Sequence, residues 1–209
     1  KTQRWGSSVV LMIVDAAFTS IGLNYFRSVV PAVERFERQF ADTGRVASLT
    51  ALARVDAGDA DLRRIWRNRR SWQMARLVAT YLVGLGTDEG LGDRGAFIRW
   101  AKSSKLVDWR NNPVGTVIGV GINTYQYLRM MGGVDTVMPD KVVRSVVGEM
   151  IGRAGIEIPA DDIAFVRLTH QIAARTGYRP IEICWMTWLI QSEAGVSRTQ
   201  KYSAVLSKI

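Results

Sequence analysis

Gly119-Val120-Gly121 and Asp140 are the residues of this chain whose types and spacing best fit a chemical task. Glycines allow the positive dihedral angles and close approaches of a tight turn. A turn that opens a helix can hold a phosphate through successive backbone amides and the helix dipole. Asp140 follows Gly121 by 140 − 121 = 19 residues, enough for one helix and a return loop. The spacing therefore predicts a phosphate-binding hairpin and, one helix later, a carboxylate at a helix start.

Asp140 also fits a purely structural role, because it follows Pro139 and precedes an apolar helix, where aspartate is a common N-cap. The two roles are compatible. Cap amides favour the ionised carboxylate, and a carboxylate beside an extruded nucleotide can stabilise the cationic sugar that forms as the glycosidic bond breaks. It can equally orient or deprotonate the attacking water. Asp140 is therefore our candidate catalytic residue.

Helical periodicity is common along the chain and strand signals are scarce, which predicts an all-α protein of roughly nine to eleven helices. The expected helical segments are Val9–Ile21 (with Ser7 or Ser8 as N-cap), Pro31–Phe40, Leu49–Arg54, Asp61–Trp66, Ser71–Leu85, Ala96–Lys102, Asp108–Asn111, Asn123–Met131, Lys141–Gly152, Asp161–Arg175 and Ile181–Ser192. A basic tail runs from Ser197 to Ile209.

The amino-acid composition limits the classes of protein to which this chain can belong. Lys and Arg total 28 against 19 Asp and Glu, for a net charge of +9, which favours a polyanionic partner. The single cysteine, Cys184, excludes an internal disulfide and any metal or iron–sulfur site built on several thiolates of this chain. The most apolar run, Val9–Val14, is cut by Asp15 and is far too short to span a membrane. We expect a cytoplasmic protein that does not bind membranes, nucleoid-associated if the source is prokaryotic.

Three segments resemble the helix-hairpin-helix DNA glycosylases, of the endonuclease III and alkyl-base type without an iron–sulfur cluster. The stretch from Val117 to Arg144, V-I-G-V-G-I-N-T through V-M-P-D-K-V-V-R, is similar to the family's core. N-Y-F-R-S-V-V-P-A-V-E-R-F, from Asn24, resembles the early helix, and I-W-R-N-R-R-S-W-Q-M-A-R, from Ile65, resembles the segment that inserts a wedge residue into DNA. The resemblance implies one glycosylase domain over residues 1–209, with two packed helical subdomains and an active-site cleft between them. Residues of about 30–135 would form one subdomain, and about 1–29 plus 136–209 the other.

The resemblance also implies a set of site residues. Asp140 would be catalytic, and the DNA backbone would contact Gly119, Val120, Gly121, Asn123, Thr124, Lys141 and Arg144. The wedge and the base pocket would be formed by Asn24, Tyr25, Asn68, Arg69, Arg70 and Trp72, with Tyr25 and Trp72 stacking on the extruded base. No metal or other cofactor is required, although a monovalent cation could bind the hairpin carbonyls. The partner would be double-stranded DNA containing a modified base, bound by a monomer.

Asn123 departs from the family members that also cut the DNA backbone, which carry a lysine two residues after the second hairpin glycine. The implied activity is therefore monofunctional and leaves an abasic site. Two alternatives stay open: a DNA-binding protein that has lost catalysis, and a bifunctional glycosylase and lyase that uses Lys141. Outside these segments, Trp185 and Trp188 have the spacing of a buried stripe, and His170 has no catalytic partner motif.

Overall fold

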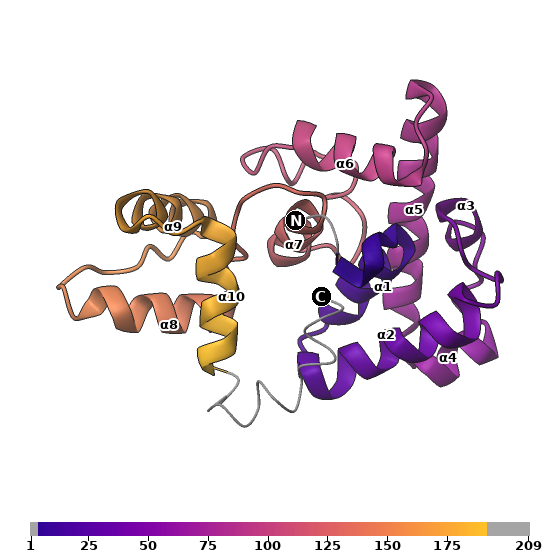
Figure 1. Cartoon of the computed structure of the whole chain (residues 1–209), viewed down its shortest axis with the longest axis horizontal. Helices are drawn as coiled ribbons and strands as arrows, with labels where there is room; N and C mark the ends of the chain where they lie inside the picture. The colour runs from indigo at the N-terminus through magenta and orange to yellow at the C-terminus, as the bar shows by residue number, and fades with distance from the viewer. Residues whose placement is uncertain (1–3, 192–209) are drawn as a thin grey trace. The chain divides into compact units, whose positions relative to one another are not determined.

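The chain folds into two compact helical units, shown in Figure 1. The structure is a computed structural model that describes residues 4–191. The first unit ends at Gly133 and the second begins at Val134. Every regular element within residues 4–191 is helical, which confirms the all-α prediction. None of the helices in this range is both long and apolar enough to cross a membrane.

Ten helical elements make up the part of the first unit that the structure describes. They are η1 (Arg4–Ser7), α1 (Val9–Thr19), η2 (Tyr25–Val29), α2 (Val30–Phe36), η3 (Glu37–Ala41), α3 (Leu49–Leu52), α4 (Ala60–Ile65), α5 (Arg69–Glu89), α6 (Asp93–Ser103) and α7 (Ile122–Met131). The π-helical turns η2 and η3 flank α2 directly, so that residues 25–41 form one continuous helical stretch.

The core of the first unit is organised by α1 and α5. α1 packs against α5 and α7, and α5 also packs against α3 and α6 (Figure 1). α1 is buried on all sides, as expected for a helix whose residues from Val9 to Phe18 are almost all apolar. Phe18 stacks on Trp66 and meets the edge of Trp72, and Phe36 also packs on Trp72. The early helix and the wedge segment of the predicted site are therefore joined by one aromatic core.

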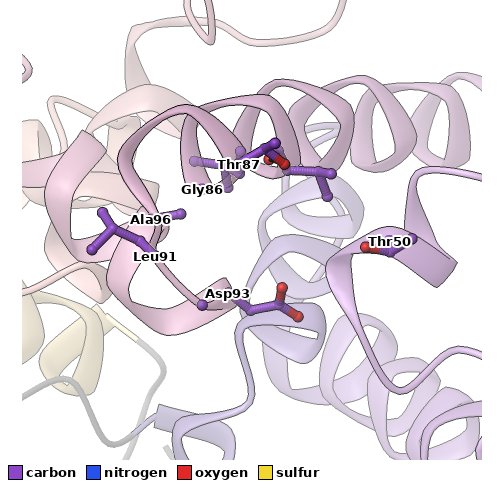
Figure 2. Close-up of a pocket in the computed structure, with 10 residues that line it drawn as sticks. Thr50, Gly86, Thr87, Leu91, Asp93 and Ala96 are labelled. Carbon is purple, nitrogen blue, oxygen red and sulfur yellow. Dashed lines mark hydrogen bonds between the residues drawn. The ribbon is translucent and has the colours of Figure 1, made fainter.

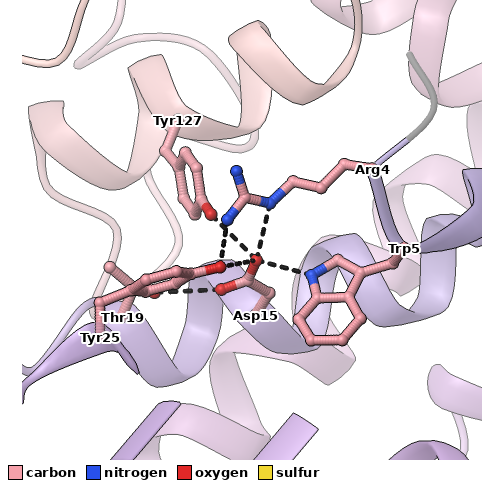
Figure 3. Close-up of polar contacts among 6 residues, drawn as sticks. All are labelled: Arg4, Trp5, Asp15, Thr19, Tyr25 and Tyr127. Atoms are coloured by element: carbon pink, nitrogen blue, oxygen red, sulfur yellow. Dashed lines mark hydrogen bonds and ion pairs between the residues drawn. The ribbon is translucent and has the colours of Figure 1, made fainter. Parts of the chain in front are cut away.

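A polar network lies within this core, around the one charged residue of α1 (Figure 3). Asp15 is 0% exposed, and its Oδ2 accepts hydrogen bonds from Arg4 Nε (3.0 Å), Trp5 Nε1 (2.7 Å), Tyr127 Oη (2.9 Å) and Tyr25 Oη (3.2 Å). Thr19 donates to Oδ1 at 3.2 Å. Five donors surround one buried carboxylate, which ties the N-terminal turn η1, η2 and α7 to α1.

The second unit contains α8 (Lys141–Gly152), α9 (Asp162–Thr176) and α10 (Pro180–Gln191). α10 packs against both α8 and α9. The buried side chains of this small core include Val143, Val147, Phe165 and Cys184.

Several predicted boundaries change in the structure. We expected residues 1–29 to join the C-terminal subdomain, but α1 packs against α5 and α7 and belongs to the first unit. α5 begins two residues before the predicted Ser71 and ends at Glu89, where Gly90 adopts the left-handed conformation that closes the helix. Asp108–Asn111 is a hydrogen-bonded turn and not a helix. The basic tail Ser197–Ile209 lies outside the described residues.

Candidate nucleic-acid interface and acidic site

The predicted hairpin is a tight turn of the first unit that leads directly into α7. The Val120 amide donates to the Val117 carbonyl at 2.9 Å, which closes a four-residue turn. Gly119, the third residue, has φ +98°, the positive value that a type II turn requires at this position. Ile118 is 74% exposed at the second position, whereas the side chain of Val120 is buried. The turn therefore favours glycine at position 119 because it needs a positive φ there.

The N-terminus of α7 is left open by the chain itself. Gly121 is the N-cap residue, so no side chain caps the helix, and its first turn carries no acidic residue. The backbone amides of Gly121, Ile122 and Asn123 donate no hydrogen bond to any part of residues 4–191. By contrast, side chains cap α1, α3, α4, α5, α8 and α9. The free amides and the positive end of the helix dipole favour an anion at this turn.

The fold does not require glycine at position 121. Its φ of −92° and ψ of 176° are available to any residue, and a Cβ built there would meet no atom within 4 Å. Gly92, the N-cap of α6, has the same properties, with φ −72°, ψ 171° and open space around its Cβ. Gly119 and Gly121 thus differ: the turn needs the positive φ of the first, whereas neither the backbone nor the packing requires glycine at the second.

Met74 connects the hairpin to the predicted wedge segment. A Cβ at Gly119 would lie 3.5 Å from the Met74 sulfur, so the turn rests against the beginning of α5. Met74 stands one helical turn after Arg70 on α5. The helix that begins with Arg69 and Arg70 is therefore the one against which the hairpin packs.

The wedge residues Asn68, Arg69 and Arg70 lie at the start of α5, whereas we expected this helix to begin only at Ser71. Asn68 is the N-cap of α5, and its Oδ1 accepts from the Ser71 amide at 3.2 Å. Arg69 and Arg70 occupy the first turn of α5, are exposed, and form no ion pair within residues 4–191. Both remain available to phosphates, whereas Asn68 has a structural role as a cap.

The two aromatic residues expected to stack on a base are core residues instead. Trp72 is 0% exposed and its Nε1 donates to the Trp66 carbonyl at 2.9 Å. Tyr25 is 5% exposed, and its hydroxyl belongs to the network around Asp15. Burial of this hydroxyl raises the pKa of Tyr25 well above its ordinary value. Their burial argues against the predicted stacking role of both residues, and Asn24 beside Tyr25 is an exposed cap that accepts from the Arg27 amide at 2.9 Å.

Asp140 is the N-cap of α8, as predicted, but it has an additional partner. Its Oδ1 accepts from the amides of Val142 (2.8 Å) and Val143 (2.9 Å). Its Oδ2 accepts from Trp188 Nε1 of α10 at 3.0 Å. Burial raises the pKa of the Asp140 carboxyl above its ordinary value, while the three N–H donors act in the opposite direction. The cap amides lower the pKa of Asp140 as expected, but the loss of solvation on burial raises it by more.

Trp188 was not expected to be part of the site. Its spacing from Trp185 predicted a buried stripe, yet both indoles are only half-buried. Trp188 and Asp140 are 48 residues apart in the sequence, and no local sequence pattern predicts their hydrogen bond. The only available signal was that a tryptophan needs a partner for its N–H when it is partly buried.

Arg144, which we predicted to contact a phosphate, has its guanidinium engaged by contacts within the second unit. Its guanidinium donates to the carbonyls of Pro139 (3.2 Å) and Pro159 (2.7 Å), and it pairs with Asp162 at 2.6 Å. It also lies over the ring of Phe165. These contacts tie the start of α8 to the start of α9. Lys141 beside Asp140 is exposed and has no ion pair within residues 4–191.

A separate open pocket of about 400 Å³ lies in the first unit between the end of α5, the start of α6 and α3 (Figure 2). Thr50, Thr87 and Asp93 supply its polar side chains. Asp93 has a structural partner, because its Oδ2 accepts from the Leu49 amide at 2.7 Å. None of the predicted site residues lines this pocket.

Comparison of the chain with protein-family models, with curated proteins and with solved structures yields no match. Within the described residues, no group of three or more His, Cys, Asp or Glu side chains is arranged to hold a metal ion. The hairpin, the basic start of α5 and the acid at the start of α8 are therefore the features of the chain that indicate a function.

Proposed function

We propose that this chain is a monofunctional DNA glycosylase, which extrudes a damaged or modified base from double-stranded DNA and hydrolyses its N-glycosidic bond. Asp140 would supply the catalytic carboxylate, and an abasic site would remain. The observation that carries the proposal is the open N-terminus of α7, where a turn shaped by Gly119 presents unpaired amides beside a glycine that the fold does not need.

The hairpin supports a phosphate-binding role in three ways. Its amides have no acceptor in the described chain, the helix dipole points its positive end there, and the hairpin packs on Met74, one helical turn after Arg70 on α5. Such contacts hold a nucleic-acid backbone without reading its sequence. The net charge of +9 supplies a sequence-independent attraction to DNA of the kind a lesion-searching enzyme needs.

Asp140 supports the chemical step. Its carboxylate is partly shielded from water, and three N–H donors hold it in one orientation. A fixed, ionised carboxylate can stabilise the cationic sugar of the transition state more strongly than a freely rotating one, because it needs no reorganisation. Asn123 is exposed at the position where the resemblance places the lysine of lyase-competent members, which supports hydrolysis without strand cleavage.

A non-catalytic DNA-binding protein is the second candidate, and one observation favours it. Asp140 already has a complete structural role as the cap of α8 and the acceptor of Trp188. Both candidate functions use the hairpin to bind DNA, but only the glycosylase uses Asp140 in catalysis. Measuring base excision by the wild type and by Asp140→Asn therefore distinguishes them. A lyase that uses Lys141 would cut the strand without alkali.

The hairpin itself is tested with two matched glycine substitutions. Gly121→Ser and Gly92→Ser each place serine at the N-cap of a helix, where it is at least as favourable as glycine. We expect both variants to unfold at or slightly above the wild-type temperature. Only Gly121→Ser should weaken binding to a duplex with a stable abasic-site analogue, by about tenfold for the loss of one charge-assisted hydrogen bond. Equal affinities of the two variants would contradict the role of the hairpin.

A further inference from the structure

Asp140 has one acceptor position left. A carboxylate offers about four lone-pair sites, two on each oxygen. The amides of Val142 and Val143 occupy both sites of Oδ1, and Trp188 occupies one site of Oδ2. The remaining site on Oδ2 is therefore the one through which Asp140 can act on a substrate or a water molecule.

The segment that leads into Asp140 is held at both ends by α10. At its beginning, Asp135 accepts from the Ile181 amide (3.0 Å) and from Arg179 Nε (3.0 Å). At its end, Asp140 accepts from Trp188, two helical turns further along α10. The segment is thus anchored by a helix that is distant in sequence, in addition to the local cap of α8.

We propose that Trp188 is a positioning residue for Asp140: its indole N–H fixes Oδ2 and leaves a single acceptor site directed at the reacting nucleotide. The proposal rests on the proposed glycosylase activity and extends it to a residue of α10. A carboxylate held only by its cap amides could still present either free site of Oδ2. The hydrogen bond from Trp188 occupies one of these two acceptor sites. Holding a reactive group in one geometry is a large part of catalysis.

Three other titratable side chains of the second unit, Arg144, His170 and Arg179, have partners other than Asp140. Arg144 donates to backbone carbonyls and pairs with Asp162, and the His170 ring contacts Thr136 Oγ1 at 3.1 Å. Arg179 pairs with Asp135, and Lys141 extends from the adjacent first turn of α8. Trp188 is therefore the side chain whose hydrogen bond acts directly on the carboxylate.

Trp188→Phe tests the proposal, because it removes the N–H and retains most of the ring. Trp185→Phe, on the same helix and also half-buried, is the matched control. The single-turnover rate of base excision is measured against pH for each protein. Loss of the Trp188 bond should move the acidic midpoint of the profile upward and lower the maximal rate several-fold, because this bond favours the ionised carboxylate. Trp185→Phe should follow the wild type, and all three proteins should melt within a few degrees of one another.

A second readout does not depend on activity. In the ¹⁵N-labelled protein, the indole resonance of Trp188 should shift as Asp140 titrates, and this shift should disappear in Asp140→Asn. An unchanged pH profile in Trp188→Phe would overturn the positioning role and leave the proposed function standing. An indole resonance that does not shift as Asp140 titrates would show that Trp188 and Asp140 are not in contact. A wild type that excises no base would overturn the proposed function, and with it any catalytic role of Trp188.

Discussion

Removal of the Asp15 carboxylate should destabilise the first unit far more than removal of an exposed acid. Asp15 is fully buried and accepts five hydrogen bonds, among them one from Arg4, whose side chain is only 4% exposed. Asp15→Ala removes the buried carboxylate with which Arg4 pairs and which four other side chains share. Removing one partner of a buried ion pair costs about 3–5 kcal/mol. That is a large part of the roughly 5–15 kcal/mol by which a domain is stable, so we expect melting to fall by roughly 10 °C or more.

Urea unfolding, followed by tryptophan fluorescence and by circular dichroism, measures this loss. Asp61→Ala is the matched control, because Asp61 forms an exposed ion pair with Arg64 at 2.6 Å and should contribute at most about 1 kcal/mol. Asp15→Asn retains the shape of the side chain but places an amide among five donors, so its loss should approach that of Asp15→Ala. A cost for Asp15→Ala no larger than that of Asp61→Ala would refute the reasoning.

Three further predictions concern the interface and the acid. If Arg69 and Arg70 contact phosphates, each Arg→Gln substitution should reduce the slope of log affinity against log salt by about 0.9, as measured by fluorescence anisotropy at several salt concentrations. Asp140→Ala should lose about 1 kcal/mol of stability with the N-cap of α8, whereas Asp140→Asn should retain most of the cap, and both should lose excision. Because burial raises the folded-state pKa of Asp140, the wild type binds a proton more tightly when folded, and its stability falls as pH rises through that pKa. The stability of Asp140→Asn relative to the wild type, from unfolding at pH 4 and pH 7, should therefore increase with pH.

Local signals in the sequence were sufficient to predict the bounds of α8 and its N-cap residue. Pro139-Asp140 marks the start and the valines of the following turns mark the buried face, so the predicted Lys141–Gly152 is also the observed helix. Ser8 as the cap of α1 and the glycine turn before α7 were predictable for the same reason. In each case the determining contacts lie within about four residues.

Contacts between distant segments could not be predicted in this way. The Trp188–Asp140 bond and the Arg144 contacts join elements whose approach depends on packing of the whole second unit. Two signals were nevertheless present. Trp72 lies on the same face as Ala75 and Ala79, at the spacing of a buried helix side. A single aspartate in the apolar run of α1 indicated that Asp15 must be buried with partners.

Base excision under single-turnover conditions tests the central claim most directly. End-labelled duplexes that each carry one damaged or modified base are incubated with excess wild type or Asp140→Asn, and each sample is read with and without hot alkali. We predict strand breaks that appear only after alkali, for at least one class of base, and a loss of about a hundredfold or more in Asp140→Asn. Tight, salt-sensitive binding by the wild type without excision of any base, or equal excision by the two proteins, would contradict a glycosylase that acts through Asp140.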